Sequence, residues 1–318
     1  MTAPILEVRG LATHFFTRAG IVKAVDGVDL AVARGRVLGL VGESGSGKSV
    51  TGFSLIGLVD APGRIVAGSI RLDGRELVGL PPAALRALRG RRIAMVFQDP
   101  MMTLNPVLRV GTQMAMALDA HAHLPRAARR IRCRDALGRV GIPSPDERLA
   151  AYPHQLSGGM RQRVAIAMAL LNEPDMVIAD EPTTALDVSI QGQIVHEMQR
   201  LVADTGIALL WITHDLAVVS ALADDIAVMY AGRIVERGPA RDVLAEPRHP
   251  YTRGLLDSVP GEVPPGGRLP QIPGSTPALR ELPPGCAFRG RCGRASAACT
   301  TMPELPAGER SVRCHHPL

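Results

Sequence analysis

The octet that decides the fold reads Gly42-Glu43-Ser44-Gly45-Ser46-Gly47-Lys48-Ser49. It fits the pattern of a phosphate-binding loop (P-loop), in which spaced glycines precede a lysine and a hydroxyl residue. The apolar run at 37–41 is typical of a short buried strand, and residues 49–58 have helical spacing. Backbone N–H groups at such a strand-to-helix turn can bind phosphates. We expect Lys48 to reach the β- and γ-phosphates of a nucleotide and the Ser49 hydroxyl to ligate Mg²⁺.

The use of lysine in this chain supports that interpretation. Only two of the 36 basic residues are lysines, Lys23 and Lys48, and all the others are arginines. A compact ammonium group is not interchangeable with a planar guanidinium group. The lysine in the loop therefore indicates a specific role, which the alternative of a flexible Gly/Ser turn does not explain.

A second motif places two acidic residues at the end of an apolar strand. Residues 176–179 are apolar and lead directly into Asp180 and Glu181. Asp180 suits a magnesium ion, held directly or through water, and Glu181 suits a base that orients and polarises the attacking water. Acidic residues after a strand are common in turns, so it is the phosphate-binding loop upstream that favours the catalytic interpretation.

The most specific feature is the octet Leu156-Ser157-Gly158-Gly159-Met160-Arg161-Gln162-Arg163. A serine followed by two glycines at the start of a helix forms a second cap that can bind an anion. The octet resembles the signature motif of ABC ATPases, and its place just before the Asp180 strand distinguishes these from other P-loop NTPases. The resemblance implies that Ser157, Gly158 and Gly159 contact the nucleotide on a second ATPase subunit, so neither subunit has a complete site alone.

The same resemblance assigns roles to further positions. Gln98 matches the Q-loop glutamine, which implies contact with Mg²⁺ and water and a link to a helical insertion. His214 matches the switch histidine near the γ-phosphate, and Ala185-Leu186-Asp187 resembles the D-loop. Phe15 is the aromatic residue expected to stack on adenine, with Phe16 as the alternative.

Strands alternate with helical segments along the chain, which predicts an α/β fold with a largely parallel sheet. The resemblance makes this a RecA-like P-loop NTPase core with an antiparallel β subdomain and a helical subdomain inserted at about 99–158. We expect the ATPase domain to cover 1–258. Eleven of the 26 prolines lie from Pro260 onward, so 259–318 is expected to be an irregular, cysteine-containing extension.

Composition indicates a protein that does not itself cross a membrane. No apolar run reaches the length needed to span a bilayer, and the N-terminal residues lack the pattern of a secretory signal. We therefore expect a cytosolic protein whose role at a membrane comes through partners. The net charge of +6 is spread along the chain, apart from 86–92 and 126–134, which favours a generic basic surface over nucleic-acid binding.

Two stretches resemble the oligopeptide/dipeptide importer branch of the ABC family. They are Phe97-Gln98-Asp99-Pro100, continuing to Leu104-Asn105-Pro106, and His249-Pro250-Tyr251-Thr252, followed by Leu255-Leu256. The resemblance implies an ATPase that uses ATP and Mg²⁺ to drive the import of peptides or similar small solutes. The implied partners are two permease subunits, a second identical or different ATPase subunit, and an extracytoplasmic solute-binding protein. The implied location is peripheral, at the cytoplasmic face of the inner (plasma) membrane.

Two alternatives belong to other functional classes. A nucleic-acid-acting ABC ATPase usually has a long coiled coil or two cassettes in one chain, and this chain has neither. A non-catalytic regulatory subunit is disfavoured because Lys48, Asp180, Glu181 and His214 are all present. The sequence does not identify the solute, because the permeases and the binding protein determine specificity.

Four of the five cysteines lie in the extension, at Cys286, Cys292, Cys299 and Cys314. A reducing cytosol disfavours a structural disulfide, whereas four thiolates in a segment with little core suggest a metal site that organises it. Their spacing does not separate zinc from iron–sulfur. The run 285–292 resembles the C-terminal cysteine motif of the family, which implies a [4Fe–4S] cluster; zinc and a metal-free extension stay open. Cys133 is expected to be a small core residue.

Overall fold

The computed structural model describes residues 3–184, 186–259 and 270–318, which belong to two compact units. The first unit consists mainly of Ala33–Arg36 and Gly79–Leu210, and the second of Leu6–Val32, Val37–Val78 and Trp211–Leu318. Both units contain strands and helices, as the sequence predicts for an α/β fold. No helix within the described residues is long and apolar enough to cross a membrane.

The second unit contains a four-stranded sheet with the order β2-β1-β4-β5. Its strands are β1 (Pro4–Thr17), β2 (Gly20–Ala33), β4 (Gly63–Leu72) and β5 (Arg75–Glu76). Strand β4 runs antiparallel to both β1 and β5. This sheet is the antiparallel β subdomain that the resemblance implies, and its second strand leads towards the phosphate-binding loop.

The same unit contains strands in the order β11-β10-β9-β3. They are β3 (Val37–Val41), β9 (Asp225–Tyr230), β10 (Arg233–Pro239) and β11 (Ser311–Val312). Strand β3 runs parallel to β9 and is buried along its whole length, which explains its uninterrupted apolar sequence. The helices of this unit are α1 (Lys48–Leu55), α8 (Leu216–Leu222), α9 (Ala240–Ala245) and α10 (Pro250–Asp257).

The first unit is built on strand β6 (Ile93–Val96), which runs parallel to β7 (Met176–Asp180). Strand β8 (Ala208–Thr213) neighbours β7, and its first three residues belong to this unit. The helices are α2 (Pro82–Leu88), α3 (Val110–Asp119), α4 (Arg126–Arg139), α5 (Pro145–Ala150), α6 (Gly158–Leu170) and α7 (Val188–Thr205). Two short 3₁₀ turns are η1 (Pro100–Met102) and η2 (Pro153–Gln155).

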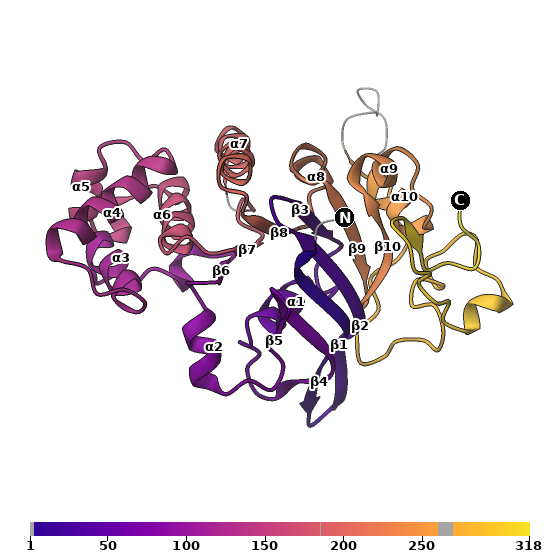
Figure 1. The fold of residues 1–318 in the computed structure, drawn as a ribbon. Helices are drawn as coiled ribbons and strands as arrows, with labels where there is room; N and C mark the ends of the chain where they lie inside the picture. Colours follow the sequence, from indigo (N-terminus) through magenta and orange to yellow (C-terminus); the bar gives the residue numbers. More distant parts are fainter. Residues whose placement is uncertain (1–2, 185, 260–269) are drawn as a thin grey trace. The chain divides into compact units, whose positions relative to one another are not determined.

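Helices α3, α4, α5 and α6 pack against one another (Figure 1). On α3, the side chains of Val110, Met114 and Leu118 are buried at four-residue spacing, the period expected for one face of a helix. On α4, Cys133 and Leu137 are buried in the same way, as expected for Cys133, and burial raises the pKa of the Cys133 thiol to about 11. Helices α3, α4 and α5 lie within 99–158, the stretch of the predicted helical insertion, whereas α6 begins at its end.

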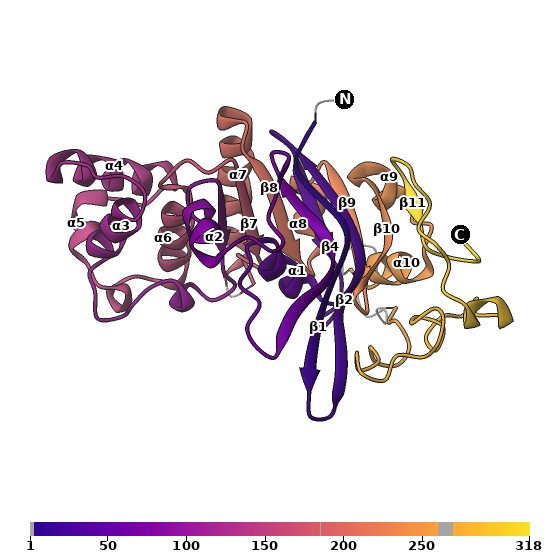
Figure 2. The same cartoon turned by 60° about the horizontal axis from the view of Figure 1, so that its bottom comes forward.

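In its described residues, 259 and 270–318, the C-terminal extension is irregular, as expected, apart from β11 and the short turn η3 (Ala297–Thr300). It nevertheless shares the core of the second unit, which the sequence did not predict. The Phe288 ring is 4% exposed, and its centroid lies 5.3 Å from that of Tyr230 and 5.4 Å from that of Tyr251. Strand β11 also pairs with β10, so the extension lies beside β10 (Figures 1 and 2). The extension is therefore packed onto the unit that carries the phosphate-binding loop.

Candidate nucleotide-binding site

The loop between β3 and α1 requires glycine at two positions for steric reasons. A Cβ atom on Gly42 would lie 2.2 Å from the carbonyl oxygen of Met229, and one on Gly47 would lie 2.1 Å from that of Ala24. Gly47 also has a φ of 104°, which glycine adopts without the strain of a side chain, and it caps the start of α1. The loop is therefore held in close contact with the backbone of β2 and β9.

Lys48 begins α1 and is only 4% exposed. Its ammonium group donates hydrogen bonds to the carbonyl oxygens of Gly42 (2.8 Å) and Glu43 (3.1 Å). The lysine is thus folded back over the loop, so its positive charge lies next to the backbone that is expected to bind phosphates. Ser49, the expected magnesium ligand, follows on the first turn of α1 and is half-buried.

His214 is an exposed residue of the second unit, directly after β8. The next residue, Asp215, caps α8, because its carboxylate accepts hydrogen bonds from the backbone N–H groups of Ala217 (2.8 Å) and Val218 (3.4 Å). The backbone N–H of Asp215 in turn donates to the Thr213 hydroxyl at 3.0 Å. The strand end and the helix cap therefore fix the backbone on both sides of the histidine.

In the first unit, Asp180 and Glu181 follow one another at the end of β7 and are 3% and 9% exposed. Glu181 has a φ of 44°, a left-handed conformation that is uncommon for residues with a side chain and concentrates at functional sites. The Gln98 amide donates to a carboxylate oxygen of Glu181 at 3.4 Å, and the Thr184 hydroxyl donates to the same oxygen at 2.9 Å. The structure thus brings Gln98 and Glu181 together and adds Thr184, which the sequence analysis did not single out.

Ser157 caps α6, since its hydroxyl oxygen accepts a hydrogen bond from the Met160 N–H at 3.3 Å. The helix therefore begins where the serine and glycine pair predicted a cap. Ser157, Gly158 and Gly159 line an open groove of the first unit together with the D-loop residues Leu186 and Asp187. Ala185, the first residue of the expected D-loop, lies outside the described residues.

Arg163 supports this groove from the buried side of α6. Its guanidinium group donates to the Val140 carbonyl (2.7 Å), a Glu197 carboxylate oxygen (2.6 Å) and the Gln193 side chain (2.8 Å). Burial raises the pKa of Glu197, although the charge of Arg163 acts in the opposite direction. These contacts join α6 to α7, so the helix that Ser157 caps is held in place by its neighbour.

The two aromatic residues expected near adenine have different surroundings. Phe15 is half-buried on β1 opposite Gly63, where a Cβ atom would lie 2.6 Å from the Phe15 ring. Phe16, the next residue, is 37% exposed and carries the Arg64 guanidinium 4.2 Å from its ring centroid. Consecutive strand residues point to opposite faces, so only one of the two rings can face a given ligand. Phe15 stays the predicted adenine partner.

No motif in the sequence indicates the surroundings of Glu43, the second residue of the loop. Its backbone N–H donates to the Tyr251 hydroxyl at 2.8 Å, and its carboxylate accepts hydrogen bonds from Arg291 and Thr276. Burial opposes ionisation of Glu43, yet the Arg291 and Thr276 hydrogen bonds lower its pKa. Tyr251 and Arg291 lie 208 and 248 positions from Glu43, so no local pattern could have revealed these contacts.

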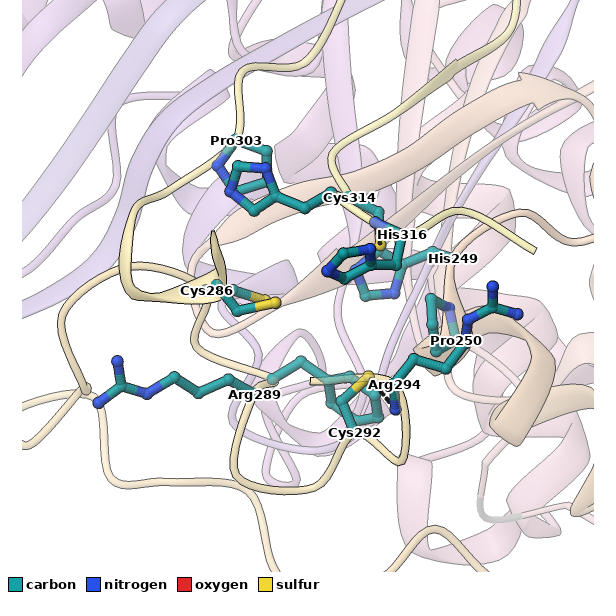
Figure 3. A pocket seen from close by; sticks show the side chains of 12 residues that line it. His249, Pro250, Cys286, Arg289, Cys292, Arg294, Pro303, Cys314 and His316 are labelled. Atoms are coloured by element: carbon teal, nitrogen blue, oxygen red, sulfur yellow. Dashed lines mark hydrogen bonds between the residues drawn. The ribbon is translucent and has the colours of Figure 1, made fainter. Parts of the chain in front are cut away.

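The four cysteines of the extension line one cavity with His249, His315 and His316 (Figure 3). Their thiols are free, and burial, with a smaller contribution from the neighbouring cysteines, raises the pKa of Cys286 and Cys314. No group of three His, Cys, Asp or Glu side chains in the described residues has the arrangement to hold a metal ion. The four cysteines therefore line one cavity, and a metal bound by them stays a prediction.

Two family models match the chain. The ABC transporter model matches residues 25–184, and the model for the C-terminal region of oligopeptide/dipeptide transporters matches residues 235–299. The chain is 47% identical over 316 residues to the dipeptide transport ATP-binding protein DppD of Haemophilus influenzae, covering 99% of this chain and 96% of DppD. It is 48% identical over 326 residues to a putative peptide import ATP-binding protein of Brucella melitensis, covering 98% of this chain and 95% of that protein.

Solved structures with the same fold are ATP-binding cassettes. The dimeric bacterial ABC transporter cassette MJ0796 matches with a TM-score of 0.68 and 26% identity, covering 74% of this chain and 99% of the cassette. The same cassette in a post-hydrolysis state with ADP and phosphate matches equally well. The cassette cbiO1 of Clostridium perfringens matches with a TM-score of 0.65 and 30% identity, covering 77% of this chain and 92% of cbiO1.

We expect Glu181→Gln to lower the rate of ATP hydrolysis at least about 100-fold, because the amide keeps the side-chain shape but cannot act as a base. Binding of ATP with Mg²⁺ should persist. Phosphate release and the fluorescence of a mant-ATP analogue measure the two properties. Glu147→Gln, an exposed substitution on α5 of the same unit, is the matched control. A Glu181→Gln protein that hydrolyses ATP as fast as the wild type contradicts the assignment of Glu181.

Proposed function

The chain belongs to the ATP-binding subunits of ABC transporters, and from this premise we propose that it hydrolyses ATP to energise the import of peptides or similar small solutes. One observation carries the proposal: the similarity to peptide-import ATP-binding proteins extends over nearly the whole chain and includes the oligopeptide/dipeptide C-terminal region. The loop geometry around Lys48 supports binding of the nucleotide phosphates.

The proposed chemistry assigns one role to each group. Backbone N–H groups of the loop and Lys48 bind the phosphates of ATP, and the Mg²⁺ ion that arrives with ATP is held by Ser49 and Asp180. Glu181 orients and polarises the attacking water. The hydrogen bond from Gln98 to Glu181 supports a role for Gln98 in sensing water and magnesium, and His214 acts near the γ-phosphate.

Hydrolysis requires a second ATPase subunit in this proposal. The cap formed by Ser157, Gly158 and Gly159 is exposed or half-buried and lines an open groove, as expected for a surface that completes the site of a partner. The dimeric state of the related cassette MJ0796 supports this assembly. The second subunit is either a copy of this chain or a related ATPase.

The proposed complex contains two permease subunits, which carry the solute through the membrane, and an extracytoplasmic solute-binding protein. The ATPase subunit is peripheral at the cytoplasmic face of the inner membrane, and its helical subdomain transmits the effect of hydrolysis to the permeases. Nucleic acid is not a partner in this proposal.

We further propose that the cysteine cavity holds a [4Fe–4S] cluster bound by Cys286, Cys292, Cys299 and Cys314. His249 supports a bound group, because its Nδ1 accepts a hydrogen bond from the Tyr251 N–H and burial lowers its pKa to about 4. The imidazole is therefore neutral, with its remaining proton on Nε2, which is buried without a hydrogen-bond partner among the described residues. An unpaired buried donor is costly, and a sulfide or thiolate in the cavity would satisfy it.

A bound cluster would supply a redox-active group or a cross-link that orders the extension. Hydrogen bonds to backbone groups already hold three of the four cysteines in position. The Cys286 N–H donates to the Cys299 carbonyl at 3.0 Å, and the thiol sulfurs of Cys292 and Cys314 accept hydrogen bonds from backbone N–H groups two residues later. Hydrogen bonds to sulfur are among the features that tune iron–sulfur sites.

Transport in proteoliposomes tests the proposed function. We expect the ATPase subunit, reconstituted with its copurified permease subunits and binding protein, to accumulate a labelled dipeptide or oligopeptide inside the vesicles only when ATP is on the side of the ATPase. The Glu181→Gln complex should bind ATP without uptake. Hydrolysis that is unaffected by peptide-loaded binding protein, with no peptide uptake, contradicts the assignment to peptide import.

Anaerobic purification tests the cluster. We expect a brown protein with about four irons and four sulfides per chain, and loss of both in Cys286→Ala. The matched control is Cys133→Ala, which removes the cysteine buried on α4 and should leave iron content unchanged. A colourless wild-type protein without iron contradicts the proposal, and one zinc ion per chain would establish the zinc alternative instead.

A further inference from the structure

The carboxylate of Glu43 is held by the C-terminal extension through a two-pronged contact. The two terminal nitrogens of Arg291 donate to the two carboxylate oxygens at 2.7 and 3.0 Å, and the Thr276 hydroxyl donates to one of these oxygens at 2.5 Å. A planar guanidinium and a carboxylate that meet through two parallel hydrogen bonds gain geometric specificity as well as energy. The contact therefore fixes the orientation of Glu43, not only its charge.

Arg291 is itself held in place by several neighbours. Its side chain is 8% exposed, its Nε–H donates to the Pro273 carbonyl at 2.8 Å, and its guanidinium carbon lies 5.9 Å from the ring centroids of both Tyr230 and Phe288. A side chain with this many contacts has little freedom to leave Glu43.

Glu43 is the point at which these contacts reach the phosphate-binding loop. Its backbone N–H donates to the Tyr251 hydroxyl, its carboxylate is bound by Arg291, and its carbonyl accepts the hydrogen bond from Lys48 at 3.1 Å. Each of its polar groups is thus fixed by a different residue. A change in the position of Glu43 would move the acceptor of Lys48, the residue expected to reach the β- and γ-phosphates.

We propose that Arg291 is a positioning residue for ATP binding, which acts through Glu43 to hold the phosphate-binding loop in the shape that accepts phosphates. The extension is then part of the nucleotide site, although Arg291 touches no nucleotide. This inference rests on the proposed nucleotide site, but not on a cluster in the cysteine cavity.

A double-mutant cycle on the full chain tests it, with mant-ATP and Mg²⁺ as the probe. We expect Arg291→Gln to raise the Kd of mant-ATP and the KM for ATP about tenfold, while kcat changes much less. Glu43→Gln/Arg291→Gln should bind mant-ATP as Glu43→Gln does, because Arg291 acts only through Glu43. Arg291→Lys keeps the charge but not the paired geometry, so its Kd should lie between those of Arg291→Gln and the wild type.

The matched control is Arg280→Gln, because Arg280 is an exposed arginine of the same extension that pairs with its neighbour Glu281. It should leave the Kd unchanged. Thr276→Val removes one hydrogen bond to Glu43, and Thr276 is not adjacent to any of the cysteines. This substitution should also raise the Kd of mant-ATP, but by less than Arg291→Gln does. If Arg291→Gln fails to fold, Thr276→Val and Arg291→Lys decide the question in its place.

Two results would overturn the proposal: additive effects of Glu43→Gln and Arg291→Gln on the Kd, or a Kd of Arg291→Gln and Thr276→Val equal to that of the wild type. A wild-type protein that binds no mant-ATP would instead contradict the nucleotide site on which the inference rests. The two failures are therefore distinguishable in one set of titrations.

Discussion

Close backbone contact at the phosphate-binding loop constrains the rest of the second unit. Carbonyl oxygens lie 2.2 and 2.1 Å from where Cβ atoms on Gly42 and Gly47 would stand, so only glycine allows the loop to turn there. This approach depends on β2 and β9 keeping their positions beside the loop, and β9 is in turn held by β3 and β10. The positions of the buried strands, the turn and the start of α1 therefore depend on one another. Lys48 folds back over the loop and donates a hydrogen bond to its first residue.

The C-terminal extension packs against the strands and the helix that hold the phosphate-binding loop. Phe288 packs on Tyr230 and Tyr251, which belong to β9 and α10, and the Tyr251 hydroxyl accepts the backbone hydrogen bond of Glu43. An aromatic cluster thus stands between the cysteine cavity and the loop, while Arg291 passes beside it to the Glu43 carboxylate. The surroundings of Glu43 give the extension a physical connection to nucleotide binding that does not depend on what the cavity holds.

Local chemistry explains which features the sequence could predict. The loop, the cap at Ser157 and the acids after β7 each depend on a few consecutive residues, so their patterns indicated a strand, a turn or a helix start correctly. The contacts of Glu43 could not be predicted, because Tyr251 and Arg291 are brought to it only by the packing of the whole unit. Burial of Phe288 also depends on distant contacts, so the sequence predicted only that it belongs to an irregular extension, whereas it is buried in the core. The choice between Phe15 and Phe16 depends on which face of β1 a nucleotide meets, and alternation along a strand does not decide that.

Binding of mant-ATP with Mg²⁺ to the wild type, Lys48→Ala and Lys48→Arg shows whether this loop binds the nucleotide, and circular dichroism verifies that each protein is folded. We predict that both substitutions weaken binding by about 100-fold, because the buried loop accommodates a compact ammonium group and neither a missing charge nor a planar guanidinium replaces it. A folded variant of either kind that binds the nucleotide as tightly as the wild type would contradict the assignment of this loop as the nucleotide site.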